Sequence, residues 1–285
     1  MTVRYEEHFF NSQDGLRLFY RQWSVPRSRG LVAVVHGLAE HSGRYQELAR
    51  ALNDGGWAVA AVDYRGHGQA GGKRAHIDHF SDYLNDIRAF LGEIRRQGYN
   101  GKPVLLGHGQ GGLICARLAE IEGERLGGLV LSSPFFGMAA KLTPVKMVAA
   151  NLFSRMLPSL TLSIKNSFDH NYLSHDRNVV ERYVSDPLVG SVATVGWFAG
   201  ILSAQQVALT EAGWVPGPLL VLQAGDDRLS SLYATRSFFE SASTQNKQLK
   251  IYDRYYHDVF NEVGRERVIA DLTNWLEINC VQRLQ

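Results

Sequence analysis

The sequence predicts an α/β protein in which helices cover both faces of a mostly parallel sheet. Two observations predict this class. Short continuous apolar segments that end in glycine or proline recur along the chain, and such segments suit strands buried on both faces. Segments with helical periodicity lie between them, so strands and helices alternate. With 285 residues, 45% of them hydrophobic, the chain can form one large domain, or one domain with an inserted subdomain.

The expected elements follow in chain order. Residues 5–10 and 16–23 are strand-like, and the Gln-Asp-Gly segment at 13–15 favours a turn, so these residues predict an antiparallel hairpin. Apolar runs then predict further strands, and periodic segments predict helices. The strands are expected at 31–37, 57–66, 102–109, 126–134, 217–225 and 247–253, and the helices near 43–54, 80–97, 111–122 and 264–280.

Residues 135–205 interrupt this alternation. They show helical periodicity and few strand signals, and they stand between two expected strands. We therefore expect a core of residues 1–134 and 206–285, with residues 135–205 inserted as a helical cap. Three of the four methionines fall in this segment: Met138, Met147 and Met156. A flexible, polarizable surface of this kind suits varied acyl chains, although ordinary helix packing explains the methionines equally well.

Composition limits the classes of partner and compartment. The net charge is +2 with no charged tail, so nucleic acid is not an expected partner. The N-terminal segment lacks an apolar signal core and no run of 18 apolar residues occurs, so we expect a soluble cytoplasmic protein. Cys115 and Cys280 are far apart in sequence and are expected to be free thiols rather than a disulfide or metal site.

Two glycine patterns resemble a nucleotide-binding motif. Gly107, Gly109 and Gly112 fit G-x-G-x-x-G between an expected strand and helix, and residues 66–71 fit it again. A dinucleotide site needs an acidic residue at the end of the next strand, but residues 132–134 there are Ser-Ser-Pro. We therefore disfavour dinucleotide binding. The chain also has no G-x-x-x-x-G-K-[ST] segment, so a P-loop is excluded.

The segment GHGQGG at 107–112 also fits the nucleophile elbow, G-x-S-x-G, with Gly109 in the position of the serine. In the fold that uses this elbow, the acid and then the base follow the nucleophile along the chain. GDDR at 225–228 follows an expected strand and supplies an acid. His257 follows the last expected strand, where a general base would stand.

An oxyanion hole is expected from two backbone amides. The His-Gly pair at 36–37 ends an early strand, so the amide of Leu38 is placed to donate to a developing oxyanion. The amide of Gln110, directly after the elbow, would be the second donor. Each fragment is weak alone, but four of them stand in the order that the fold requires, each after an expected strand.

These segments resemble the monoacylglycerol lipase and lysophospholipase branch of the α/β-hydrolases. The resemblance implies an α/β-hydrolase fold with an eight-stranded sheet, an inserted apolar cap, no cofactor and no metal. It implies that the partner is a small lipid ester or fatty acid, and that the ester is hydrolysed through an acyl-enzyme. Contact of the cap with a membrane surface stays open. The matching segments are HGLAEHSGRY (36–45), DYRGHGQAGGKR (63–74), GHGQGG (107–112), LPSLTLS (157–163), YVSDPL (183–188), LLVLQAGDDRL (219–229) and YYHDVFNE (255–262).

The resemblance also assigns residues. The acid falls on Asp227, four positions after Gln223, with Asp226 as the alternative, and the base falls on His257. The remaining histidines of the motifs are expected to have structural roles: His36, His67 and His108.

Gly109 departs from the family pattern. Glycine cannot form an acyl-enzyme, so this chain is expected to be severely impaired as a serine hydrolase. Two explanations stay open: a single substitution in an otherwise intact enzyme, or a natural pseudoenzyme that binds a lipid or a protein. The intact acid and base favour the first. Activation of water by Asp227 and His257 is a third class, whereas dehalogenase or epoxide hydrolase chemistry needs a carboxylate at 109. Ser132 and Ser133 are not expected to replace the nucleophile.

Overall fold

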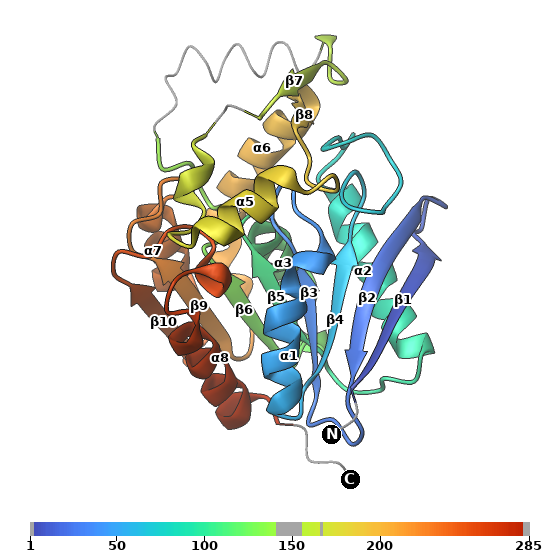
Figure 1. Ribbon diagram of the computed structural model, residues 1–285, viewed down its shortest axis with the longest axis vertical. Helices are drawn as coiled ribbons and strands as arrows, with labels where there is room; N and C mark the ends of the chain where they lie inside the picture. The colour runs from blue at the N-terminus through green and yellow to red at the C-terminus, as the bar shows by residue number, and fades with distance from the viewer. Residues whose placement is uncertain (1–2, 141–155, 166–167, 282–285) are drawn as a thin grey trace.

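A computed structural model describes residues 3–140, 156–165 and 168–281. Within these residues an eight-stranded sheet forms the centre of the molecule (Figure 1). Its strands are β1 (Arg4–Asn11), β2 (Arg17–Ser24), β3 (Leu31–Val35), β4 (Ala58–Asp63), β5 (Val104–His108), β6 (Gly128–Ser132), β9 (Leu219–Ala224) and β10 (Lys247–Tyr252). The strand order is β1-β2-β4-β3-β5-β6-β9-β10. β2 pairs antiparallel with β1 and β4, and the remaining pairs are parallel, so the predicted mostly parallel sheet is confirmed.

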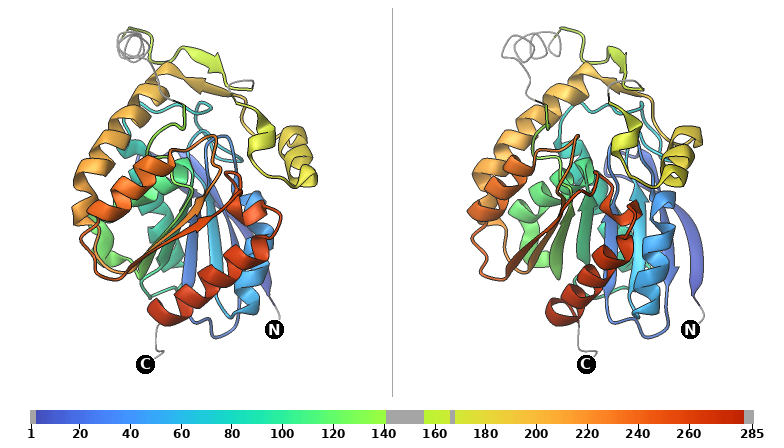
Figure 2. Two further views of the ribbon diagram at one scale, coloured as in Figure 1. Left: turned by 90° about the vertical axis from the view of Figure 1, so that its left-hand side faces the viewer. Right: turned by 60° about the vertical axis from the view of Figure 1, so that its left-hand side comes forward.

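Helices cover both faces of this sheet (Figure 2). On one face lie α1 (Gln46–Asp54) and α8 (Arg265–Asn279), and on the other lie α2 (Ser81–Arg96), α3 (Gln110–Glu122), α6 (Val195–Glu211) and α7 (Leu232–Ser241). Every residue of β3 is buried, because successive side chains enter opposite layers. Val32 and Val34 pack towards α1 and α8, whereas Ala33 and Val35 pack towards the other helices. This double burial explains why the central strands appear as continuous apolar runs.

The segment between β6 and β9 forms an extra layer beyond one end of the sheet (Figures 1 and 2). Its described elements are β7 (Thr161–Ser163), η3 (His170–Tyr172), α5 (Arg177–Ser185), β8 (Val192–Thr194) and α6. β7 and β8 form an antiparallel pair, which the expectation of a purely helical cap did not include. Residue 205, the expected end of the cap, lies inside α6, which continues to Glu211 and packs against α3.

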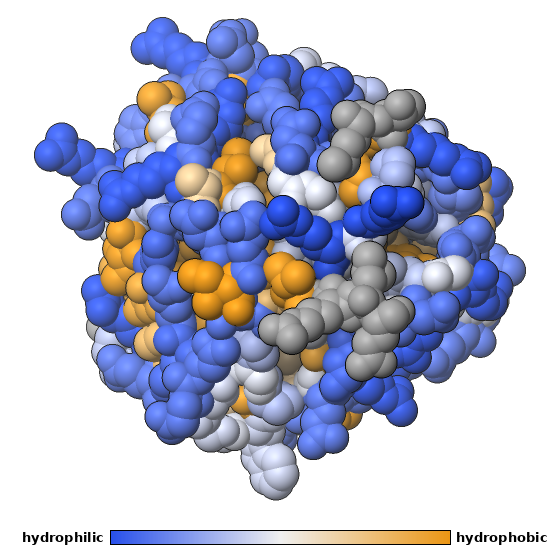
Figure 3. Space-filling model, turned by 90° about the horizontal axis from the view of Figure 1, so that it is seen from below, coloured by the Kyte–Doolittle hydropathy of each residue, from blue (hydrophilic) through white to orange (hydrophobic). Residues whose placement is uncertain are grey.

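The opposite end of the molecule is covered mainly by hydrophilic side chains, with small separate hydrophobic groups (Figure 3). In the part of the chain that the structure describes, no helix is both long and apolar enough to cross a bilayer. Cys115 and Cys280 are buried and unpaired, as expected.

Candidate active site

β5 runs into α3 through a single residue, Gly109, with φ 51° and ψ −118°. A positive φ is the left-handed region that favours glycine. The residues two positions before and after it are glycines because the backbone elements approach closely here. A β-carbon on Gly107 would lie 2.4 Å from the carbonyl oxygen of Gly111, and one on Gly111 would lie 2.1 Å from that of Val35. The sequence therefore folds here into a sharp strand-to-helix turn, with residue 109 at its tip.

His257 lies beside this tip. A β-carbon built on Gly109 would be 3.2 Å from His257 Nε2. The opposite ring nitrogen, Nδ1, lies 2.9 Å from Oδ2 and 3.2 Å from Oδ1 of Asp227. His257 is 8% exposed, and Nε2 has no hydrogen-bond partner among the described residues. The loop that carries the histidine is fixed by the inserted segment, because the backbone N–H of His257 donates to the carbonyl of Tyr172 and that of Asp258 to Leu173.

Asp227 follows β9 and is fully buried. Its Oδ1 accepts the backbone N–H groups of Leu229, at 2.9 Å, and Ser230, at 2.8 Å. Its Oδ2 accepts from the side-chain amide of Gln223 at 3.2 Å. The neighbouring Asp226 is 39% exposed and forms an ion pair with Arg228, so of the two acids only Asp227 contacts His257.

Each member of this pair changes the pKa of the other. Burial alone would lower the pKa of His257, but the charge of Asp227 and the hydrogen bond to it outweigh burial and raise that pKa above its ordinary value. Burial alone would raise the pKa of Asp227, but the charge of His257 and the hydrogen bonds from His257, Ser230 and Leu229 lower it. Asp227 is therefore ionised near neutral pH, and it favours a proton on His257.

The two backbone amides expected to donate to an oxyanion belong to Leu38 and Gln110. The N–H groups of Leu38 and Gln110 donate to no other residue in the described ranges, and both residues line the pocket that contains Gly109. The loop that carries Leu38 has a strained backbone, because Ala39 has φ 64°. Gly190 of the inserted segment stabilises this turn by donating its N–H to the Ala39 carbonyl at 2.8 Å.

Sequence reasoning missed a buried ionic cluster beneath this loop. Arg44 donates to Glu40 at 3.2 Å and to Asp258 at 2.8 Å. Glu40 in turn accepts the N–H of Gly37 at 3.0 Å. Burial would raise the pKa of Glu40, but Arg44 outweighs it and lowers the pKa to about 2. The cluster joins the Leu38 loop to the residue after His257, and the i, i+4 spacing of Glu40 and Arg44 within the HGLAEHSGRY motif was the available signal.

A pocket of about 300 Å³ opens onto Gly109 and His257. Two of the three methionines expected to contact substrate are described, and of these two Met138 lines the pocket. Met156 is 70% exposed and is not among the lining residues, and Met147 lies outside the described residues. The lining instead relies on aromatic and branched side chains that the sequence did not single out: Phe135, Ile164, Phe168, Leu173, Tyr183, Trp197, Phe198 and Leu229.

The other polar residues of the motifs have structural surroundings. His36 and His67 are buried, and burial lowers the pKa of each to about 3, so both are neutral. His108 Nδ1 lies 3.1 Å from Ser132 Oγ beneath the turn, as expected for a structural histidine. Ser133 Oγ accepts from the backbone of Ala224 at 3.4 Å. Among the described residues, no group of three or more His, Cys, Asp or Glu side chains could hold a metal ion.

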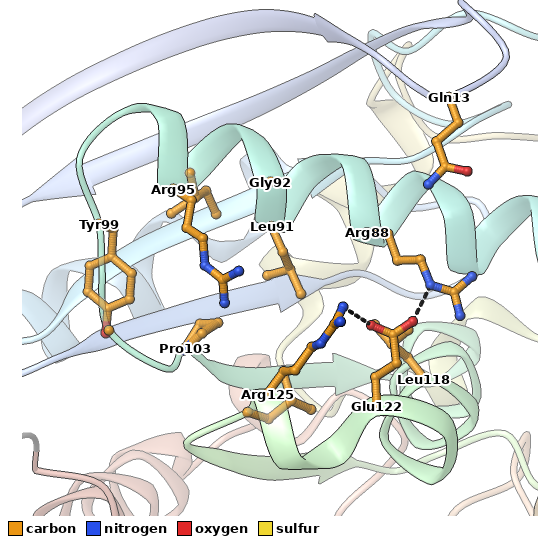
Figure 4. A pocket seen from close by; sticks show the side chains of 13 residues that line it. Gln13, Arg88, Leu91, Gly92, Arg95, Tyr99, Pro103, Leu118, Glu122 and Arg125 are labelled. Carbon is orange, nitrogen blue, oxygen red and sulfur yellow. Dashed lines mark hydrogen bonds and ion pairs between the residues drawn. The ribbon is translucent and has the colours of Figure 1, made fainter.

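A second recess, of about 230 Å³, lies between α2 and the end of α3, away from Gly109 (Figure 4). Two of its arginines share one carboxylate, because Arg88 and Arg125 both donate to Glu122. Arg95 also lines this recess. Asp227 and His257 form the ionisable pair that lies directly beside residue 109, at the tip of the strand-to-helix turn.

Comparisons with known proteins agree with this geometry. The profile of the family described as "Serine aminopeptidase, S33" matches residues 26–264. The chain is 32% identical to a monoacylglycerol lipase of Mycolicibacterium smegmatis over 273 residues, covering 95% of this chain and 96% of that protein. It is 35% identical to the human monoglyceride lipase over 284 residues, covering 96% and 92% respectively.

Solved structures of monoacylglycerol and monoglyceride lipases superpose on this fold. The crystal structure of a monoacylglycerol lipase from Paleococcus ferrophilus superposes with a TM-score of 0.82 at 29% identity, covering 98% of this chain and all of that one. A monoglyceride lipase from Saccharomyces cerevisiae, solved with a substrate analogue, superposes with a TM-score of 0.83 at 20% identity, covering 99% and 97% of the two chains.

Proposed function

Because the chain belongs to the S33 family of α/β-hydrolases, in its monoacylglycerol lipase branch, we propose that it is a scaffold for hydrolysis of monoacylglycerol-like or lysophospholipid-like esters, with Gly109 at the nucleophile position. The observation that carries the proposal is the orientation of the His257 ring. Its Nε2 would lie 3.2 Å from a β-carbon on residue 109, and its Nδ1 is hydrogen-bonded to Asp227. A histidine held in this way is the general base that a hydroxyl at position 109 requires.

The remaining residues take the roles of a serine hydrolase. In a chain with serine at 109, His257 takes the hydroxyl proton while the oxygen attacks the ester carbonyl carbon. The amides of Leu38 and Gln110 then stabilise the oxyanion, and His257 returns the proton to the departing alcohol. Asp227 stays ionised and stabilises the protonated imidazole, since its pKa is lowered. Water, activated by the same histidine, releases the fatty acid.

The glycine at 109 removes the first of these steps. No acyl-enzyme forms without an oxygen on residue 109, so His257 has no hydroxyl to deprotonate. In proteases that lack a triad member, about 10³–10⁴-fold acceleration over water remains. We therefore expect the chain to hydrolyse esters very slowly, while its acid, base and oxyanion donors stay in position.

The substrate class follows from the pocket. Its aromatic and branched walls suit an acyl chain, and the two relatives above are a monoacylglycerol lipase and a monoglyceride lipase. A Bacillus subtilis relative, 30% identical over 249 residues, is a phospholipase, so lysophospholipid-like esters belong to the proposal too. We assign the segment from 135 to the first half of α6 as the cap over the acyl chain. Ile164, Phe168 and Trp197 from this segment line the pocket.

A second function is favoured by the same pocket. A site that keeps its oxyanion donors and apolar walls but lacks a nucleophile can retain a lipid without turnover, as a binding module does. Installing serine at position 109 and measuring hydrolysis of a monoacylglycerol separates the two. Strong hydrolysis by Gly109→Ser supports the hydrolase scaffold, and no hydrolysis by a folded variant leaves the binding module.

A further inference from the structure

A chain of buried hydrogen bonds connects the inserted segment to the turn at Gly109. Trp197, in the first turn of α6, donates its indole N–H to Oε1 of Gln110 at 3.0 Å. Nε2 of Gln110 lies 3.2 Å from the hydroxyl of Tyr64. That hydroxyl lies 3.2 Å from the carbonyl oxygen of Gly37 and 3.3 Å from that of His36. All three side chains are buried: Trp197 is 5% exposed, Gln110 2% and Tyr64 0%.

The chemistry of the end groups fixes the direction of every bond in this chain. An indole N–H can only donate, so the carbonyl end of the Gln110 side chain must face Trp197 and its amide end must face Tyr64. The Tyr64 oxygen accepts that N–H, and its own proton is then free for the carbonyl of Gly37, which can only accept. Gln110 and Tyr64, in the middle of the chain, each accept one bond and donate the next, an arrangement in which each bond polarises the next.

The last bond of the chain acts on the Leu38 amide. The carbonyl of Gly37 and the N–H of Leu38 belong to one planar peptide group and point in opposite directions. A hydrogen bond that fixes the carbonyl therefore also fixes the direction of the N–H. The neutral ring of His36 supports the same carbonyl through Nδ1 at 2.8 Å. The backbone N–H of Gln110, whose side chain is in the middle of the chain, is the other proposed oxyanion donor.

We propose that Trp197, the Gln110 side chain and Tyr64 are positioning residues that couple the seating of α6 to the orientation of the Leu38 amide. This inference rests on the proposed function, since the amides matter only if an oxyanion forms between them. It goes beyond that function because it makes the inserted segment part of the oxyanion hole rather than only a cover for the acyl chain. Catalysis, and not only binding of the acyl chain, then depends on α6 being packed in the position seen here.

The kinetic test uses the full chain with Gly109→Ser. Tyr64→Phe should lower kcat about tenfold while KM changes little, because a misdirected amide weakens binding of the transition state rather than of the ester. Trp197→Phe should lower kcat in the same direction. Because both substitutions act through one chain of bonds, the kcat of the double variant should be little lower than that of the more impaired single variant. Losses that multiply in the double variant would mean independent effects and overturn the coupling.

Matched controls separate positioning from packing. Tyr20 is another fully buried tyrosine, and its hydroxyl has no partner among the described residues, so Tyr20→Phe should leave kcat and KM unchanged. Trp275 has an unpartnered buried indole N–H, and Trp275→Phe should affect stability without a selective loss of kcat. If Tyr20→Phe lowers kcat as much as Tyr64→Phe does, the hydroxyl of Tyr64 has no special role.

A second readout needs no turnover and uses the chain with Gly109. In protein labelled with ¹⁵N-tryptophan, the indole N–H signal of Trp197 is identified by its loss in Trp197→Phe. Tyr64→Phe should shift that signal and speed its exchange with solvent, whereas Tyr20→Phe should not. An unchanged signal in Tyr64→Phe overturns the coupling even if Gly109→Ser is active. If the signal responds but Gly109→Ser hydrolyses no ester, the proposed function fails and the hydrogen-bond coupling remains.

Discussion

A β-carbon on residue 109 would lie 3.2 Å from Nε2 of His257, so Gly109 leaves the histidine facing the space where a side chain would begin. The other side of the ring is held by Asp227. This relationship between Gly109 and His257 determines most of the following predictions, because restoring a side chain at 109 brings an atom within reach of the base.

Gly109→Ser should increase hydrolysis of a short p-nitrophenyl ester and of a monoacylglycerol by about 10³-fold or more, the scale of a restored triad. The measurement is initial rate against substrate concentration with purified protein. Gly109→Ala is the matched control, since it adds the β-carbon without the hydroxyl, and it should give no gain. His257→Ala in the serine background should remove the gain. A folded serine variant no faster than the parent contradicts the proposed nucleophile position.

Asp227→Asn in the serine background should lower kcat by about 10⁴-fold, the loss seen when an asparagine leaves the histidine in the wrong tautomer. Asp226→Asn is the control, because Asp226 is partly exposed and pairs with Arg228 instead. It should change kcat less than about twofold, as expected for a surface ion pair. A larger loss of kcat in Asp226→Asn than in Asp227→Asn would mean that Asp226 is the catalytic acid.

Gly109→Ala should lower the urea midpoint of unfolding with an unchanged slope. A non-glycine residue at φ 51° costs about 1–3 kcal/mol, and the new β-carbon is also tight against His257. The alanine recovers only about 0.5–1 kcal/mol of backbone entropy. Gly92→Ala is the control: Gly92 lies in α2 with nothing within 4 Å of an added β-carbon, so it should stabilise by about 0.5–1 kcal/mol. Equal stabilisation at both sites would show that Gly109 is not strained.

The pH dependence of the serine variant should follow His257. The base must be neutral, and its pKa is raised above 6.5 by Asp227, so kcat/KM should rise with pH and reach half its limit above pH 6.5. The same shift has the opposite effect on stability. The contribution of His257 to folding is complete below pH 6.5 and is lost as pH rises through its folded pKa. The stability difference between the parent and His257→Gln should therefore shrink across that interval. A kinetic midpoint below 6.5 contradicts the assignment.

The chain with Gly109 should bind decanoate without turnover. The acyl tail gains from burial in the pocket at about 25 cal/mol per Å² of apolar surface, and the carboxylate can accept from the free amides of Leu38 and Gln110. Calorimetry below the critical micelle concentration should show saturable heat, weakened by Phe198→Ala. Arg95→Gln, in the recess of Figure 4, should leave the affinity unchanged. Loss of binding in the arginine variant would place the fatty acid in the other recess.

The core of the fold could be predicted from sequence because its strands are buried on both faces. Such strands have no polar face, so β3 and β5 appear as unbroken apolar segments with glycine at their ends. Asp227 and His257 could be placed for a related reason, since residues that follow adjacent strands meet at one edge of the sheet. The elbow was visible because close approach of strand and helix requires glycine at 107 and 111.

The inserted segment was harder to predict because its contacts are with distant parts of the chain. Met156 belongs to the same apolar pattern as Met138, yet it is exposed, and no local rule separates the two. Trp197 and Gln110 are 87 positions apart, and neither residue alone indicates a hydrogen bond. The cap boundary expected at 205 falls inside α6, because the sequence does not change character where this helix passes from the pocket to its contact with α3.

The inserted segment holds the loop of His257 partly through main-chain atoms, with the carbonyls of Tyr172 and Leu173 accepting from His257 and Asp258. Main-chain carbonyls are the same in every residue type. A substitution at 172 or 173 therefore keeps these two acceptors, whereas the insertion or deletion of one residue moves both at once. In descendants of this chain, we expect the stretch before α5 to keep its length, and to keep Ser174 and His175, whose side chains bond to Glu262.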